Sequence, residues 1–308
     1  MTDVQPSNAG SYTVTVANGA GSATSSAANL TVLPESPSAR LVNISTRAQV
    51  GTGGNILIPG FVIGGSGMET LLIRADGPSL AQFGVAGVLA QPSLKLFDSA
   101  GNVIASNTGW GANPSPDQIA SVAASVGAFA LASGSADCAL IANLPAGAYT
   151  VQVLGANGTT GVALAEVYEV SSSGTRLINI ATRAQVGTGG NILIAGFVIE
   201  GTGVEELLVR GDGPALTAFG VSGVLAQPSL TVTAQSNGST IGTNTGWSTN
   251  ANPAQIASVA AAVGAYSLPT GSADSAVVVN LPAGGFTAQV SGVNSTSGVA
   301  LAEVYEVP

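Results

Sequence analysis

Runs of β-branched and large apolar residues, each closed by a glycine-rich or polar turn, recur along most of the chain. The segments 55–63 and 69–74 are two such runs, and the segments 148–154 and 162–170 are two more. Residues 93–104 place apolar positions on both sides of a Ser-Ala-Gly-Asn turn, a pattern typical of a β-hairpin. Short apolar runs between turn residues predict the strands of an all-β sandwich.

One segment departs from this pattern and predicts a short helix. Ser115 is placed to cap the helix, Pro116 suits its first position, and Gln118 completes a capping box. Apolar residues then recur at helical spacing up to residue 126, and residues 252–255 (Asn-Pro-Ala-Gln) begin a second copy of the segment. We expect each helix to bury one face on its sandwich, as a lid over the end of the sheets.

The pattern recurs because the chain carries two copies of one sequence. Residues 40–58 return almost verbatim as residues 176–194, a spacing of 136 residues (176 − 40 = 136). Solenoid units repeat about every 20–50 residues, so a period of this length indicates a copied domain. The predicted organisation is a partial hairpin at 1–34, a linker at 35–39, a β-sandwich module at 40–170, a linker at 171–174 and a second module at 175–308.

The N-terminal segment contains two further strand patterns, in which apolar and polar residues alternate. The apolar positions are Tyr12, Val14, Val16, Leu30 and Val32. Residues 8–33, with Asn-Gly-Ala-Gly between the two patterns, resemble the final hairpin of a bacterial immunoglobulin-like domain. Tyr12 falls where that family has its tyrosine corner, two residues before Val14, which takes the place of the family's second cysteine.

A hairpin of this kind cannot bury its own apolar side. Leaving five such side chains in water forgoes roughly 1.5–3 kcal/mol each, or about 7–15 kcal/mol, and whole domains have a net stability of about 5–15 kcal/mol. We therefore expect these five residues to form a subunit interface with another copy of the chain, head to tail, which builds a fibre. The alternative is that the chain is clipped from a longer protein and the hairpin folds back on the first module.

The two copies resemble another group of proteins. Residues 94–104 and 143–153 are similar to the strand and turn phrases of bacterial pre-peptidase C-terminal domains, which are β-sandwich modules of large secreted proteins. The resemblance implies jelly-roll-like sandwiches that serve attachment or spacing outside the cell. It places the chain in the extracellular space or on a cell surface.

Composition excludes several classes of function. Charged residues make up 7% of the chain, against roughly 25% in an average soluble domain. The net charge is −9 and Lys95 is the single lysine, so no cluster of cations exists for nucleic acid or anionic lipid. The mean hydropathy is +0.45, yet no apolar run is long enough for a membrane span. A surface so poor in charge favours association between copies.

The few charges recur at equivalent positions in the two copies. A buried unpaired charge is costly, so we expect recurring charges to be partnered inside the fold. The predicted structural ion pairs involve Arg47, Arg74, Asp76, Glu166, Arg183, Arg210, Asp212 and Glu303. Further charges that recur are Arg40, Asp137 and Glu169 in the first copy and Arg176, Asp274 and Glu306 in the second. A pair of carboxylates of the glycosidase type is the enzymatic alternative.

Other candidate chemistry is sparse. The chain has no histidine, and its one cysteine, Cys138, is replaced by Ser275 in the second copy. A calcium loop at residues 98–102 is disfavoured because the second copy has Gln235 in place of the acid. We therefore predict no catalytic residue, no metal site and no cofactor.

Each copy has one tryptophan, Trp110 and Trp247, in a loop after Asn-Thr-Gly. These two rings either pack against the nearby helix or contact a polysaccharide. The sequence thus predicts a non-enzymatic structural subunit of an extracellular filament or surface assembly. The alternative is a carbohydrate-binding or anchoring module of a larger secreted enzyme or adhesin.

Overall fold

The computed structural model describes residues 8, 10–30, 39–170 and 174–308. The chain divides into two compact units, Met1–Ser38 and Ala39–Pro308. Antiparallel strands dominate both units, so the predicted all-β fold is confirmed. Val32 and most of both predicted linkers lie outside the described residues.

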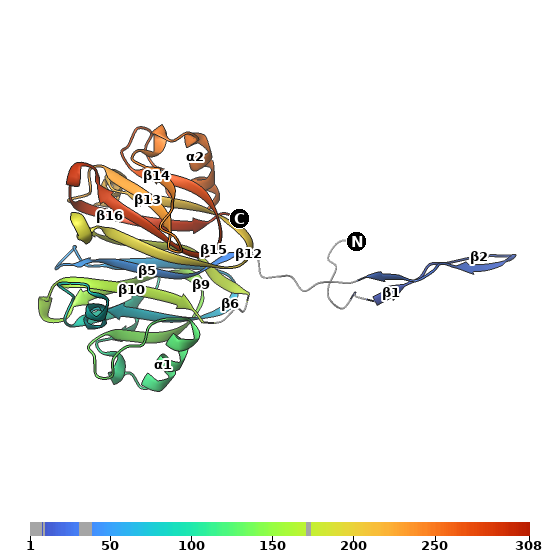
Figure 1. Ribbon diagram of the computed structural model, residues 1–308, viewed down its shortest axis with the longest axis horizontal. Coiled ribbons are helices and arrows are strands. Elements are labelled where there is room, and N and C mark those ends of the chain that lie inside the picture. Colours follow the sequence, from blue (N-terminus) through green and yellow to red (C-terminus); the bar gives the residue numbers. More distant parts are fainter. Residues whose placement is uncertain (1–7, 9, 31–38, 171–173) are drawn as a thin grey trace. The chain divides into compact units, whose positions relative to one another are not determined.

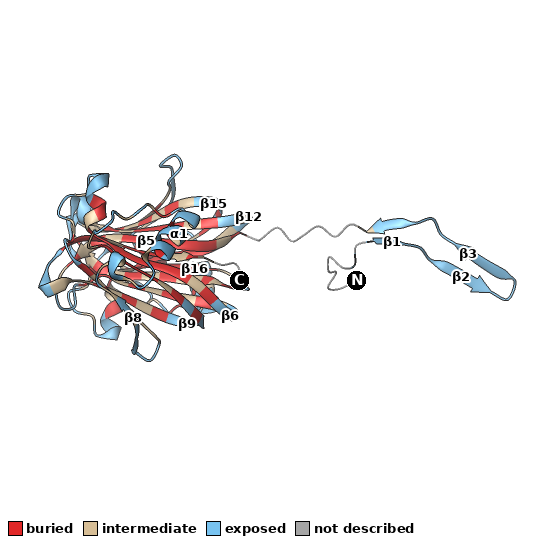
Figure 2. Cartoon of the chain, turned by 90° about the horizontal axis from the view of Figure 1, so that it is seen from below, coloured by how far each residue is buried: buried red, intermediate tan, exposed pale blue. Residues whose placement is uncertain are grey.

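The first unit is a hairpin made of two short ladders. Strand β1 (Gly10–Tyr12) pairs with β4 (Ala28–Leu30), and β2 (Thr15–Asn18) pairs with β3 (Gly21–Thr24), both antiparallel. The Asn18 side chain accepts a hydrogen bond from the Ala20 amide at 2.9 Å and so stabilises the turn between β2 and β3. Figure 2 shows this hairpin as almost wholly exposed.

The second unit holds both repeats. The strands of the first repeat are β5 (Arg40–Val50), β6 (Ile58–Asp76), β7 (Pro92–Phe97), β8 (Val103–Asn107), β9 (Cys138–Gly155) and β10 (Gly161–Glu169). Those of the second are β11 (Thr175–Val186), β12 (Leu193–Asp212), β13 (Pro228–Ala234), β14 (Thr240–Asn244), β15 (Ser275–Gly292) and β16 (Gly298–Glu306). The α-helices are α1 (Pro116–Ser125) and α2 (Pro253–Ala262). Short 3-10 helices occupy Pro78–Phe83, Trp110–Ala112, Ala156–Gly158, Gly189–Asn191, Pro214–Phe219, Trp247–Thr249 and Val293–Ser295.

The long strands β6 and β12 each pair with both repeats. In β6, the residues before the bend pair with β11 of the second repeat, and those after it pair with β10 of the first. The bend contains Gly65 and Gly67 at φ +93° and +117°, where the pairing of β6 with β9 shifts register. Glycine is required there because other residues rarely adopt these angles. Strand β12 repeats the arrangement with β5 and β16.

The first strand of each repeat is therefore inserted into the other repeat. Strand β5 lies between its own β10 and the foreign β12, and β11 lies between its own β16 and the foreign β6. In the described part of this unit, the ladders connect twelve strands in the order β14-β13-β15-β12-β16-β11-β5-β10-β6-β9-β7-β8. Figure 1 shows β5 and β10 between the two lobes that carry α1 and α2.

This arrangement differs from the predicted tandem of separate modules divided at 171–174. The repeats share one unit, Ala39–Pro308, and one hydrophobic core to which both contribute. Phe61 and Phe197 are fully buried in it, and their rings stack on Tyr149 and Phe286 with centroids 5.4 and 5.7 Å apart. The hydrophobic pattern of a strand does not identify the strand that it pairs with. Strands β5 and β11 have nearly identical sequences, so they offer nearly identical edges for pairing.

Each helix buries one face against the strands of its repeat, as predicted. On α1, Ile119 and Ala123 are buried in a small cluster with Leu72 of β6, and α2 builds the matching cluster in the second repeat. The predicted cap is wrong in one respect: Ser115 holds the N-cap position but its side chain makes no capping hydrogen bond. The Asn113 side chain instead accepts from the Ser115 amide at 3.2 Å and shapes the entry to the helix. Among the described residues, no helix is long and apolar enough to cross a membrane.

Candidate functional site

The apolar stripe of the hairpin is the first candidate. Tyr12, Val14 and Val16 are 46%, 66% and 69% exposed, and Leu30 is half-buried. The Tyr12 hydroxyl donates a hydrogen bond to the Asn8 carbonyl at 2.7 Å. Four of the five predicted interface residues fall in the described region.

A buried charge network lies in the first repeat. The Arg74 guanidinium is 2.8 Å from an Asp76 oxygen and 3.2 Å from a Glu166 oxygen, and its Nη1 donates to the Phe129 carbonyl at 2.7 Å. Tyr168 donates to the other Glu166 oxygen at 2.6 Å. The Phe129 ring lies over the guanidinium, and its centroid is 4.2 Å from the Arg74 Cζ atom.

The second repeat reproduces this network with one substitution. Arg210 contacts Asp212 at 2.5 Å and Glu303 at 3.2 Å, and Tyr305 donates to Glu303 at 2.8 Å. Tyr266 replaces Phe129, and its hydroxyl adds a hydrogen bond to Asp212 at 2.5 Å. Two of these networks at equivalent positions mark a structural element of the repeat.

Each network holds one guanidinium and two carboxyl groups out of water. Burial, together with the negative charge of Glu166, raises the pKa of Asp76 well above its usual range. In the second repeat, burial and the charge of Glu303 raise the pKa of Asp212, against the opposing effect of Arg210. Six of the eight predicted ion-pair residues thus form ion pairs.

The prediction for Arg47 and Arg183 is wrong. Both are half-buried on β5 and β11, and neither comes within ion-pair distance of a carboxylate in the described part of the chain. Each is partly exposed, so water can solvate the charge and no partner is needed.

The arginines at the start of the same two strands, Arg40 and Arg176, do form ion pairs. Arg40 pairs with Glu169, and Arg176 pairs with Glu306 at 3.1 Å. Glu169 also accepts a hydrogen bond from the Leu177 amide, and Glu306 accepts one from the Leu41 amide at 2.6 Å. Both amides belong to the opposite repeat, so these carboxylates fasten the two repeats together. We call these two sets of contacts the seam latches.

Burial raises the pKa of Glu169 to about 7 and that of Glu306 to about 7. The amide and arginine contacts oppose this shift without cancelling it, because the side chains are only 2% exposed. Carboxyl groups with a pKa near neutrality are often found at functional sites. Sequence reasoning noted these charges as repeated, but their separation in the chain concealed their pairing.

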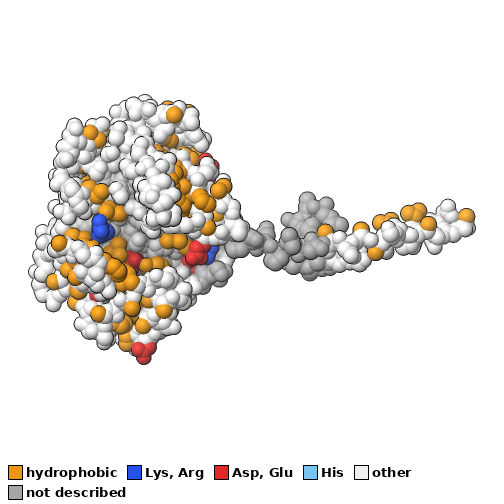
Figure 3. Space-filling model, viewed as in Figure 1, with side chains coloured by type: hydrophobic (Ala, Val, Ile, Leu, Met, Phe, Trp, Pro, Cys, Tyr) orange, Lys and Arg blue, Asp and Glu red, His pale blue; other side chains and the backbone are white. Residues whose placement is uncertain are grey.

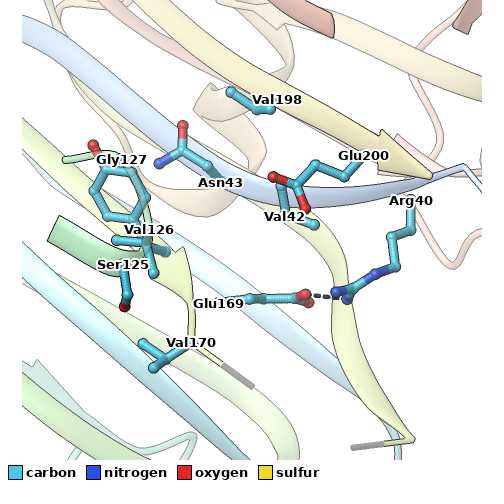
Figure 4. Close-up of a pocket in the computed structure, with 11 residues that line it drawn as sticks. Arg40, Val42, Asn43, Ser125, Val126, Gly127, Glu169, Val170, Val198 and Glu200 are labelled. Carbon is cyan, nitrogen blue, oxygen red and sulfur yellow. Dashed lines mark hydrogen bonds and ion pairs between the residues drawn. The ribbon is translucent and has the colours of Figure 1, made fainter. Parts of the chain in front are cut away.

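A pocket opens beside each seam latch. The first seam pocket has a volume of about 490 Å³, and Figure 4 shows its lining residues. Val42, Val126, Val170 and Val198 form apolar walls. Its polar members are Arg40, Asn43, Ser125, Tyr168, Glu169 and Glu200.

The second seam pocket, of about 320 Å³, holds the equivalent residues Arg176, Asn179, Tyr305 and Glu306. Each pocket is lined by both repeats, because Val198 contributes to the first and Val62 to the second. On the face shown in Figure 3, charged side chains are few.

The two tryptophans pack against the protein. Trp247 is 7% exposed within the α2 cluster, and its indole N–H donates to the Pro269 carbonyl at 3.0 Å. Trp110 packs against the α1 cluster and donates to the Ala132 carbonyl at 3.2 Å. Of the two roles predicted for these rings, packing against the helix is the one that the geometry supports.

The remaining candidates have local structural roles. Cys138 is fully buried and burial raises its pKa to about 12, so the thiolate that reacts is absent near neutrality. Asp98 accepts hydrogen bonds from the Ala100 and Asn102 amides at 3.0 and 2.8 Å, which stabilises the turn between β7 and β8. Within the described residues, no group of three or more acidic, cysteine or histidine side chains is placed to hold a metal.

Comparisons with known proteins add little to this all-β architecture. No family model matches the chain, and no curated protein matches it. Among solved structures, it is similar to a DUF4785 family protein from Legionella pneumophila, at 10% sequence identity and a TM-score of 0.20, over 88% of this chain and 80% of that one. A likeness at this score carries no argument about fold or function.

Proposed function

We propose that the protein is a structural subunit of an extracellular filament or cell-surface assembly, joined head to tail through its N-terminal hairpin. The observation that carries the proposal is the exposed apolar stripe of Tyr12, Val14 and Val16. The hairpin that carries this stripe has no charged residue between positions 8 and 30. The partner is a second copy of the chain.

Two features of the larger unit support this proposal. The exchanged strands β5 and β11 join the repeats into one body, which suits a spacer that must transmit force without coming apart. The low charge of the chain leaves little electrostatic repulsion between neighbouring copies. By contrast, the polysaccharide alternative lacks support at Trp110 and Trp247, since both rings are engaged by their own helices.

The decisive experiment places charge on the stripe. The double variant Val14→Asp/Val16→Asp should remain monomeric in sedimentation velocity and show no filaments in negative-stain micrographs, because buried carboxylates would be unpaired at the interface. The matched control is Thr13→Asp/Ala17→Asp, which adds the same charge at exposed polar-face positions of the same hairpin. Dispersed monomers of the wild-type chain at high concentration, or assembly by both variants alike, would disprove the proposal.

A further inference from the structure

The first seam pocket is lined by two carboxylates, Glu169 and the exposed Glu200, and by one guanidinium, that of Arg40. Arg40 forms its ion pair with Glu169 and also lies opposite Glu200 in the β5–β12 ladder, so one cation serves two carboxylates. Glu200 also lines the pocket, and within the described residues its carboxylate makes no ion pair or hydrogen bond. In Figure 4 the Glu200 carboxylate lies among the other lining side chains, on the same side of the latch as Asn43. When Glu169 is ionised, the pocket therefore has one more negative than positive charge.

Its other surfaces suit a ligand with an apolar part. The valine walls Val42, Val170 and Val198 can cover a short hydrocarbon chain. Asn43 uses its amide N–H group for the carbonyls of Ile44 and Val167 at 3.2 Å each, which leaves its oxygen as an acceptor. Acceptors at one end and apolar walls beside them favour a donor-rich cationic group on a short apolar stem.

We propose that the first seam pocket binds an organic cation, an ammonium or guanidinium group on a short apolar stem, with Glu200 as the counter-ion. The site is separate from the hairpin stripe and does not depend on assembly. The bound cation comes either from a small free amine or from a lysine or arginine side chain of another protein.

The second seam pocket provides an internal control. The position equivalent to Glu200 is Gly64 (200 − 136 = 64), so that pocket keeps the latch but has no carboxylate there. One cation per chain is therefore expected. A side chain at Gly64 would meet the side chain of Ile178, whose Cγ2 and Cδ1 lie 2.9 and 3.0 Å from the ideal Cβ position, so Ile178 must change its rotamer to admit it.

The test uses the full chain with n-butylguanidinium and n-butylammonium as probes and n-butanol as the uncharged control. Broadening of the probes' methyl proton signals reports binding whatever the size of the protein assembly. We expect broadening with both cations that salt weakens, none with butanol, and a loss in Glu200→Gln. The Gly64→Glu variant should broaden the cation signals further by adding a second site.

Two further arms complete the design. The blocked tripeptides acetyl-Gly-Lys-Gly-amide and acetyl-Gly-Arg-Gly-amide show whether a protein side chain can enter, since a site for free amines alone would exclude them. Thermal melting of both variants verifies folding, and Glu200→Gln decides the question if Gly64→Glu fails to fold. Equal broadening in wild-type and Glu200→Gln protein, or equal broadening by butanol and the cations, would overturn the proposal.

Discussion

The hydroxyl groups of Thr46 and Thr182 hydrogen-bond to each other at 2.9 Å in the interior of the larger unit. The two residues hold the same position in the two repeats (182 − 46 = 136). Nearby, Gln49 of β5 pairs with Gln185 of β11, again two equivalent residues. Equivalent residues that meet each other mark a pseudo-twofold axis, so the unit has the internal symmetry of a dimer within one chain.

The first prediction concerns the integrity of this unit. Cleavage at a protease site introduced within residues 171–173 should leave the two fragments together, because β5 and β11 each pair with the opposite repeat. Size-exclusion chromatography of the cleaved protein should give the elution volume of the intact chain, and separation should require denaturant. Elution as two half-sized species in buffer would show that the repeats fold independently.

The second prediction concerns pH. The pKa of Glu169 and of Glu306 is raised to about 7 in the folded chain, so the folded state binds protons more tightly than the unfolded state. The stabilisation from protonation is complete below the unfolded pKa and is lost as the pH rises through about 7. Each carboxyl group should contribute at most about 3.5 kcal/mol, taking about 1.4 kcal/mol per pKa unit.

Guanidinium unfolding at pH 5 and pH 8 measures this effect. The midpoint should be lower at pH 8, and the difference should shrink in the double variant Glu169→Gln/Glu306→Gln, which cannot ionise at the latches. The raised pKa of Asp76 and Asp212 acts in the same direction. Greater stability at pH 8 than at pH 5 would contradict the assignment.

The third prediction separates buried from solvated arginines. Arg74→Met should destabilise the fold by about 3–5 kcal/mol, because it leaves the carboxyl groups of Asp76 and Glu166 buried without their cation. Arg47→Met is the matched control, and should change stability by less than about 1 kcal/mol since Arg47 makes no ion pair in the described part of the chain. Denaturant midpoints provide the comparison. Similar losses in both variants would argue against the network.

The fourth prediction concerns the single thiol. Cys138→Ser should be tolerated, with a change in stability of about 1 kcal/mol or less. The reason is that Ser275 already holds the equivalent place and donates to the Pro228 carbonyl at 2.7 Å. In the wild-type protein, a thiol reagent should label Cys138 only after denaturation, as its pKa of about 12 and full burial imply. Rapid labelling of the native chain at pH 7 would be inconsistent with both.

Features that depend on neighbouring residues could be predicted from the sequence. The helix at Pro116–Ser125 follows from a proline at its start and apolar residues at helical spacing. The hairpin of β7 and β8 follows from a turn between two apolar runs. Arg74 and Arg210 could be recognised as partnered because a rare charge recurred in an apolar strand, and burial of such a charge requires a partner.

What only the tertiary structure decided is which distant segments meet. Strands β5 and β11 have almost the same sequence, so either could pair with the edge of either repeat, and the structure shows each paired with the long strand of the opposite repeat. The latch between Arg40 and Glu169 spans 129 residues, and nothing local links the two. The seam pockets exist because strands from both repeats line them, and therefore no single repeat encodes them.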